Sequence, residues 1–335
     1  MNLFIDKENL MSFIQSRKSD KDFFDVCERV MKRQLDVKFN FLKSDITEEG
    51  LRTFFCGFCE GCGTSKMDFC PNKVPSRPVS SKNCLDWNWS EYSSIFLVSD
   101  ENLPALKRKN MVLMGDKGEE LKTFRSLLCK NDYLFIKKID SKQMSSWKQI
   151  FNELKPSGES EAYPLPCTDI IINDRYLFKQ QKEILEANLC DLLPCLTECP
   201  SKDDRAKVNI VIFTLHDFLD VDVAKKIINK AIEKSTGKKP NLTFVTSRDN
   251  KLIGHDRFIF TNYYKIESGD SFIYFDTSGK FISNGDGVTF FSLADKDNYE
   301  GMKVKQKELN EIVATICKTN NDYIIGDRKS NFIKF

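Results

Sequence analysis

The stretch KVNIVIFTLHDFLDVDVAKKIINKAIEKSTGKKPNLTFVTS, residues 207–247, places two short apolar runs on either side of a longer amphipathic segment. The flanking runs, KVNIVIFTL and NLTFVTS, are rich in β-branched and aromatic residues, which is typical of strands buried on both faces. The segment between them has helical periodicity and ends at Gly237, a residue type favoured just after a helix. This order predicts two parallel strands joined by a right-handed helical crossover.

The same alternation extends in both directions. Upstream, residues 167–178 (CTDIIINDRYLF) are predicted as a buried strand, and residues 180–196 (QQKEILEANLCDLLPCL) as a helix broken at Pro194. Downstream, residues 257–266 (RFIFTNYYKI) and 271–276 (SFIYFD) are predicted as antiparallel strands. A last helix is marked by Leu309, Ile312, Val313 and Ile316. The predicted fold class is therefore α/β, with a mixed sheet flanked by helices.

A chain of 335 residues is long enough for two hydrophobic cores. Residues 155–166, KPSGESEAYPLP, combine prolines with polar and small residues and are predicted to form a linker. We therefore expect an N-terminal domain over residues 1–160 and a C-terminal domain over residues 161–335. Apolar runs that alternate with helical ones from residue 94 onward predict that the N-terminal domain is also α/β.

The nearly equal numbers of basic and acidic residues exclude a strong overall electrostatic field around the protein. Because 51 basic residues face 49 acidic ones, binding to nucleic acid or to an anionic membrane would have to rest on a local patch. No run approaches the roughly 18 apolar residues of a membrane span, and the start, MNLFIDKENLMSF, is unlike a signal peptide. We expect a cytoplasmic protein without a transmembrane segment.

Several of the 12 cysteines gather in residues 54–71, FFCGFCEGCGTSKMDFCP. Two residues between cysteines allow both thiolates to reach one metal from a tight turn. We predict a zinc site in a Cys-rich segment over residues 54–84, which has no apparent apolar period and which metal binding would order. The predicted zinc ligands are Cys56, Cys59, Cys62 and Cys70.

Two alternatives to a zinc site stay open. The first is an iron–sulfur cluster, since Cys-x2-Cys-x2-Cys followed by Cys-Pro is close to the bacterial ferredoxin run, although the last gap is longer here. The second is a set of reduced cysteines in a loop and core.

Only two histidines, His216 and His255, occur in the chain. His255 lies in GHDRFIFTN, where it opens a predicted strand together with a basic residue two positions later. The order of a strand ending in NDRY, a strand–helix–strand unit and then this His-x-basic motif resembles the phospholipase D-like superfamily over residues 168–290. The motif of that superfamily is His-x-Lys, then Asp after four residues, followed by Gly and Ser. The resemblance implies that the histidine attacks phosphorus, the lysine holds phosphate oxygens and the aspartate supports a histidine.

This sequence departs from the motif at two of its three positions, because Arg257 replaces the lysine and Asn262 replaces the aspartate. Arg257 is able to grip a phosphate through its planar fork. Asn262 cannot stabilise an imidazolium as a carboxylate does. One histidine must attack while another protonates the leaving group, so His216 or a second copy of His255 in a homodimer would complete the set. The candidate catalytic residues are His255, Arg257, Asn262 and His216.

The resemblance is nearest to the phospholipase D-like C-terminal domain that accompanies microtubule-interacting-and-transport modules, a non-catalytic membrane-binding domain. We therefore expect a non-catalytic or weakly catalytic protein that recognises phosphate groups, foremost those of nucleic acid. The predicted phosphate-binding residues are Arg257, Ser268, Asp174 and Arg175. Such domains also occur in bacterial phage-defence and mobile-element proteins, so a role of this chain in one of those settings is a further expectation.

Three alternatives to this function remain. One is a metal-independent phosphodiesterase or nuclease that acts as a dimer through His255. Another is a membrane-surface or protein-interaction adaptor. In the third, His255 and Arg257 only bind backbone groups or carboxylates at the start of a strand and so serve the fold.

Overall fold

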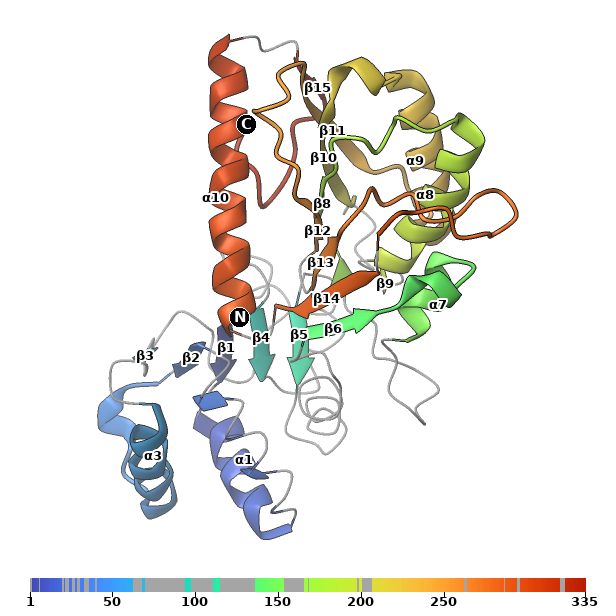
Figure 1. The fold of residues 1–335 in the computed structure, drawn as a ribbon. Coiled ribbons are helices and arrows are strands. Elements are labelled where there is room, and N and C mark those ends of the chain that lie inside the picture. The colour runs from blue at the N-terminus through green and yellow to red at the C-terminus, as the bar shows by residue number, and fades with distance from the viewer. Residues whose placement is uncertain are drawn as a thin grey trace. The chain divides into compact units, whose positions relative to one another are not determined.

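A computed structural model gives the structure of the chain, which divides into two compact units (Figure 1). The first unit contains Met1–Leu134 and Leu293–Tyr299, and the second contains Phe135–Ser292 and Glu300–Phe335. The residues that the structure describes are 2–5, 7–19, 21, 24–25, 28, 31–32, 36–39, 41–62, 68–69, 94–97, 111–114, 136–153, 166–167, 169–197, 199–200, 207–261, 264–285, 287–293, 296–319 and 323–335.

The first unit contains a parallel sheet with the strand order β3-β2-β1-β4-β5. Its strands are β1 (Asn2–Ile5), β2 (Asp36–Phe39), β3 (Asp68–Phe69), β4 (Ser94–Leu97) and β5 (Met111–Met114). The helices whose bounds lie within the described residues of this unit are α1 (Lys7–Ser19), η1 (Lys43–Asp45) and α3 (Glu49–Cys62). The strand order reverses between β1 and β4, the kind of point at which open parallel sheets bind ligands. The residues that directly follow β1 and β4 lie outside the described ones.

Helix α3 packs through an apolar face of phenylalanines. Leu51, Phe54, Phe55 and Phe58 are buried, and their spacing brings them to one side of the helix. The Phe39 ring of β2 lies 4.9 Å from the Phe55 ring and 5.9 Å from the Phe58 ring. The expectation that the Cys-rich segment lacks an apolar period is therefore wrong for the part that lies in α3.

The second unit contains an eight-stranded mixed sheet with the order β15-β11-β10-β8-β12-β13-β14-β6. Its strands are β6 (Ile136–Ile139), β8 (Asp169–Asn173), β10 (Asn209–Leu215), β11 (Asn241–Ser247), β12 (Arg257–Phe260), β13 (Tyr264–Ser268), β14 (Val288–Ser292) and β15 (Ile324–Gly326), and a separate pair joins β7 (Pro166–Cys167) to β9 (Cys199–Pro200). Strands β8, β10 and β11 are parallel, and the others join antiparallel. The predicted mixed sheet flanked by helices is thus confirmed.

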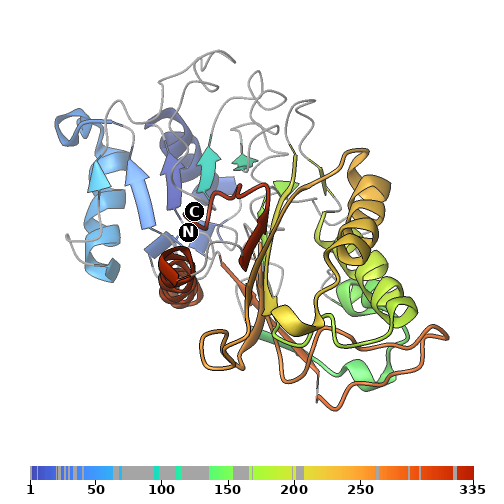
Figure 2. The ribbon, with the colours of Figure 1, turned by 90° about the horizontal axis from the view of Figure 1, so that it is seen from above.

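Helices cover both faces of this sheet. They are α7 (Trp147–Asn152), α8 (Lys182–Leu196), α9 (Val221–Thr236) and α10 (Lys296–Thr319), with short η5 (Ser141–Gln143) and η6 (His216–Phe218). Figure 2 shows α8 and α9 on one face and α10 on the other. Strands β8, β10 and β11 lie side by side in the sheet in the same order as along the chain. Right-handed crossovers between them therefore place α8 and α9 on the same face. Asp220 caps the start of α9, because its side chain accepts hydrogen bonds from two backbone N–H groups of the first turn. Gly237, with φ 72°, caps the end of the helix.

Helix α8 differs from its prediction, since it continues through Pro194 to Leu196. Pro194 lies in the last turn, where a missing N–H donor removes a single helical hydrogen bond. Leu192, Leu193 and Leu196 are buried around it, so packing against the core holds this turn in place.

The two strands predicted over residues 257–266 and 271–276 also differ. The first is in fact two antiparallel strands, β12 and β13. Residues 271–276 form no strand, apart from one isolated bridge at Phe275. Their backbone N–H groups donate to buried side chains instead, Phe272 to Asp174 and Phe275 to Asn188. Side chains distant in sequence thus replace a neighbouring strand.

The structure also places residues 136–153 in the second unit, where β6 pairs with β14. These residues precede the boundary predicted at residue 160. Of the predicted linker, residues 155–166, only Pro166 belongs to the described part of the chain.

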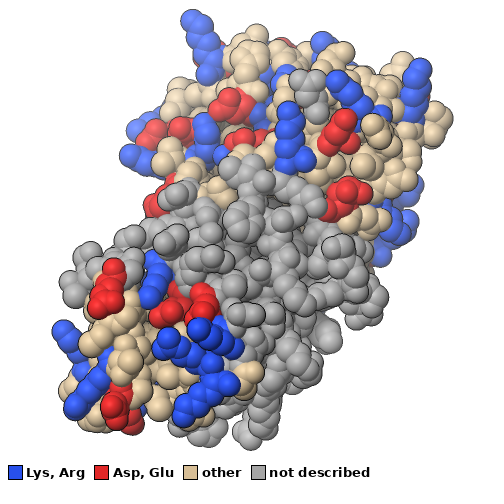
Figure 3. All heavy atoms as spheres, turned by 60° about the horizontal axis from the view of Figure 1, so that its bottom comes forward, with Lys and Arg blue, Asp and Glu red and all other residues tan. Residues whose placement is uncertain are grey.

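The surface carries charges of both signs. Figure 3 shows basic and acidic side chains interspersed over the described residues of one face, in keeping with the formal net charge of +2. Among the helices of the described residues, none combines the length and the apolarity needed to cross a bilayer.

Candidate functional site

Five of the predicted site residues, Asp174, Arg175, His216, His255 and Arg257, lie near the ends of the parallel strands of the second unit. Residues 173–176, 216–218 and 248–250 end or follow β8, β10 and β11, and we call them, together with residues 255–257, the carboxyl edge. The last group belongs here because β12 runs antiparallel to β8 and pairs Phe258 with Asn173. In α/β sheets this edge is the usual place for ligands.

Arg175 is the most buried cation of the carboxyl edge, with 2% of its surface exposed. Its Nη1 lies 2.5 Å from Nε2 of His255, and its Nη2 donates to the backbone oxygen of Asn250. A guanidinium only donates hydrogen bonds, so this contact requires Nε2 of His255 to act as the acceptor. Within the described residues, Nε of Arg175 has no hydrogen-bond partner and no ion pair joins this side chain to a carboxylate.

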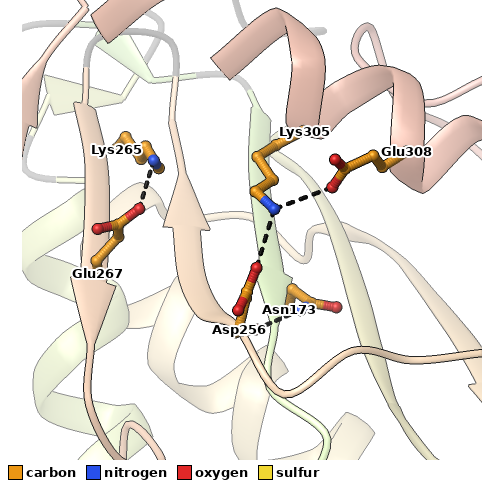
Figure 4. A network of polar contacts seen from close by, with 6 residues as sticks. All are labelled: Asn173, Asp256, Lys265, Glu267, Lys305 and Glu308. Atoms are coloured by element: carbon orange, nitrogen blue, oxygen red, sulfur yellow. Dashed lines mark hydrogen bonds and ion pairs between the residues drawn. The ribbon is translucent and has the colours of Figure 1, made fainter. Parts of the chain in front are cut away.

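Asp256 anchors the segment that carries His255. Nδ2 of Asn173 donates to the backbone oxygen of Asp256 at 2.5 Å, and Nζ of Lys305 on α10 lies 2.9 Å from its carboxylate (Figure 4). The same lysine pairs with Glu308 at 3.0 Å. The hydrogen bond with Asp256 raises the pKa of Lys305 above its ordinary value. These contacts fix the residues on both sides of Asp256.

Arg257 is half-buried and lies beside carboxylates. Its Nη1 donates to the backbone oxygen of Gly269 at 2.9 Å, its Nε has no partner among the described residues, and its register partner on β13 is Ser268. Its charge also acts on Asp174 and Asp270 and favours the ionised form of each carboxyl. These two carboxyl groups therefore interact with the charge of Arg257.

Asp174 is fully buried and holds the loop after β13. Its carboxylate accepts hydrogen bonds from Oγ of Ser271 at 2.6 Å and from the backbone N–H groups of Phe272 at 2.9 Å and Tyr176 at 3.0 Å. Burial raises the pKa of Asp174 above its ordinary value, although these hydrogen bonds and Arg257 oppose the shift. Asp174 is thus an acceptor that organises the backbone.

His216 and His255 have different partners. Its Nδ1 lies 3.0 Å from Oγ1 of Thr246, and its ring centroid lies 4.9 Å from that of Tyr323. In the described part of the chain, no contact joins the two histidines. Asn262, the remaining candidate catalytic residue, lies outside the described residues.

Aromatic and basic residues that the sequence did not single out surround Arg175. The ring of Tyr176 lies 6.0 Å from the ring of Phe218 and 6.5 Å from the imidazole of His255, measured between centroids. Nζ of Lys179 lies over the rings of both Tyr176 and Phe218. One signal was available, because Tyr176 and Phe218 each follow the end of a buried strand within three residues. Nothing in the sequence indicated that the rings of Tyr176 and Phe218 would lie next to each other.

The cysteines of the predicted zinc site are described only in part. Cys56 and Cys59 lie three residues apart on α3, one turn from each other. The side chain of Cys62 and all of Cys70 lie outside the described residues. Among the described residues, no group of three His, Cys, Asp or Glu side chains is placed to hold a metal ion. The fit of zinc to these cysteines stays a prediction, as does the iron–sulfur alternative.

No family model, no curated protein and no solved structure matches this chain.

Proposed function

We propose that the second unit recognises phosphate groups, foremost those of nucleic acid, without turning them over. The carboxyl edge is the binding site, with Arg175 as its main cation, His255 beside it and Arg257 as a secondary contact. The observation that carries the proposal is the guanidinium of Arg175, which is only 2% exposed and whose Nε has no hydrogen-bond partner in the described part of the chain.

The free-energy cost of burying Arg175 supports an anionic ligand. A buried charge is costly unless another charge and further hydrogen bonds compensate for its lost hydration. Here the described hydrogen-bond partners of the Arg175 guanidinium are an imidazole nitrogen and a backbone oxygen, neither of which carries a negative charge. A phosphate at the carboxyl edge would supply the missing charge, and it would reach the planar donor face of the guanidinium once the exposed His255 side chain moves aside.

The state of His255 favours binding over catalysis. A nucleophilic imidazole needs a free lone pair, and the lone pair on Nε2 accepts from Arg175. The dimeric phosphodiesterase would therefore require His255 to leave Arg175 before attack. His216 does not provide the second imidazole in this arrangement, since it contacts Thr246 and Tyr323.

Binding of a labelled single-stranded oligonucleotide to the full chain at several salt concentrations tests the proposal. A phosphate site predicts that affinity falls as salt rises, with a slope of about −0.7 per contacted phosphate in a logarithmic plot. Arg175→Gln should weaken binding by about 1.5 to 3 kcal/mol, the range of a hydrogen bond to a charged group. Lys307→Gln, 81% exposed on α10, is the matched control and should bind like the wild type.

Three outcomes would speak against the proposal. Cleavage of the oligonucleotide that disappears in His255→Ala would establish the phosphodiesterase instead. Binding to anionic liposomes in place of the oligonucleotide would favour the membrane-surface adaptor. Unchanged affinity in a folded Arg175→Gln variant would show that the guanidinium has no part in binding.

A further inference from the structure

An aromatic and cationic cluster lies beside the proposed phosphate site. It consists of Tyr176, Phe218, Lys179 and His255 around Arg175, and we call it the aromatic–cation cluster. We infer that this cluster binds an unpaired base, so that the ligand is single-stranded nucleic acid. The inference rests on the proposed function and adds to it the class of nucleic acid and the residues that distinguish it.

The half-buried rings of Tyr176 and Phe218 form the apolar part of the cluster. Tyr176 follows β8, Phe218 lies in η6 after β10, and the ring centroids are 6.0 Å apart with planes inclined at 56°. Phe218 packs with its inner side against the hydrophobic core of the unit. The core therefore fixes its position. Aromatic rings held at a sheet edge offer a face on which bases of any identity can stack.

Cations border both rings. Nζ of Lys179 lies 5.6 Å from the Tyr176 centroid and 6.0 Å from the Phe218 centroid. Cζ of Arg175 lies 5.4 Å from the Tyr176 centroid. A base on these rings would have its own phosphates next to Lys179, which is exposed, and next to Arg175, which is buried and lacks a partner at Nε among the described residues. Aromatic faces and positive charges thus lie side by side, as recognition of a base and its phosphate requires.

Single strands satisfy this arrangement better than duplexes. In a duplex both faces of each base are covered by neighbouring bases, whereas an unpaired base can leave its stack at a smaller cost. Lys179 has a long, exposed side chain, so it can move aside from the rings and turn to a phosphate. In a single strand, two consecutive phosphates could each contact one of the cations Arg175 and Lys179, which would strengthen binding.

The experiment compares three probes on the full chain: a single-stranded oligothymidylate, an abasic oligomer of the same length and a duplex. Tyr176→Leu and Phe218→Leu remove the aromatic faces and keep apolar side chains. Phe335→Leu, which removes a ring that is 38% exposed and does not belong to the cluster, is the control. Circular dichroism and thermal unfolding check that each variant is folded.

We expect Tyr176→Leu and Phe218→Leu to weaken oligothymidylate binding by about fivefold to a hundredfold each. Binding of the abasic oligomer should not change, and Tyr176→Phe should restore oligothymidylate affinity. Lys179→Gln, an exposed change that leaves both rings in place, should reduce the salt slope by about 0.7. It keeps the test valid if a ring variant fails to fold.

Failures of the two proposals are distinguishable. Wild-type affinity for oligothymidylate in folded Tyr176→Leu and Phe218→Leu would overturn the cluster as a base site and leave phosphate recognition intact. Duplex binding as tight as single-strand binding would also overturn it. If the wild-type chain binds neither the abasic oligomer nor oligothymidylate, the proposed function fails as well.

Discussion

Replacing Asn188 with alanine removes a side chain that makes five hydrogen bonds inside the second unit. Asn188 on α8 is 1% exposed. Its Oδ1 accepts from the indole N–H of Trp147 at 3.3 Å and from the backbone N–H groups of Tyr274 at 2.9 Å and Phe275 at 3.1 Å. Its Nδ2 donates to the backbone oxygens of Ile184 at 2.8 Å and Phe275 at 2.7 Å. One amide thus joins α7, α8 and the strand-free segment 271–276.

The magnitude follows from the donors that would be left without a partner. In Asn188→Ala the three N–H groups that pointed at Oδ1 remain buried. A buried unsatisfied donor costs about 1 to 3 kcal/mol, and a water molecule in the vacated volume recovers part of this. We expect a loss of about 3 to 6 kcal/mol in the free energy of unfolding, a large part of the total for an ordinary domain.

Urea unfolding followed by circular dichroism measures the difference. The matched control is Asn241→Ala, which removes a single bond from Nδ2 to Oδ1 of Asn209 at 2.8 Å and should cost about 1 kcal/mol. Asn188→Leu fills the same space without an acceptor and should be at least as destabilising as Asn188→Ala. If Asn188→Leu were as stable as the wild type, volume rather than hydrogen bonding would account for the role of Asn188.

The remaining predictions concern ionisation, backbone geometry and metal. Burial raises the pKa of Asp174, so its contribution to stability is complete below the ordinary value of 3.8 and is lost as pH rises through the raised pKa. Asp174→Asn cannot ionise, and the stability of this variant relative to the wild type should rise from about pH 4 upward; a difference that stays flat in urea unfolding would contradict the burial argument. Gly326 has φ 121°, and a Cβ there would lie 2.0 Å from a backbone oxygen of β11, so Gly326→Ala should cost more than about 2 kcal/mol in thermal unfolding. Gly301→Ala in α10, where a Cβ meets nothing within 4 Å, should instead stabilise by about 0.5 to 1 kcal/mol, and equal effects at both glycines would refute this reasoning. Elemental analysis should find about one zinc per chain, lost in a Cys56→Ser, Cys59→Ser double variant. Iron in its place would support the iron–sulfur alternative, and metal-free protein would refute both.

Local rules were enough to predict the centre of the second unit. Strand β11 spans residues 241–247, as its apolar run predicts, and α9 ends at Gly237. Both features depend on neighbours in sequence, since periodicity decides which face is buried and glycine relieves the backbone after the last turn. The mixed sheet with flanking helices follows from the order of such elements.

The composition of the carboxyl edge was predictable only in part. The sequence singles out His255 and Arg257 because they stand at a predicted strand start. The partner of His255 in the structure is Arg175, 80 residues away, and Arg257 instead lies beside two carboxyl groups. Register between β8 and β12 decides this, and register depends on how whole strands bury their faces.

Taken by itself, the sequence determined which segments are strands and helices where the pattern is long and periodic, because those preferences act over a few residues. Only the tertiary structure decided that residues 271–276 give up strand pairing, since Asp174 and Asn188 satisfy their N–H groups from other elements. It also decided that Arg175 is buried with no carboxylate paired to it among the residues that the structure describes. The physical reason is the same in both cases: the free energy of a buried polar group depends on partners that the fold brings from distant parts of the chain.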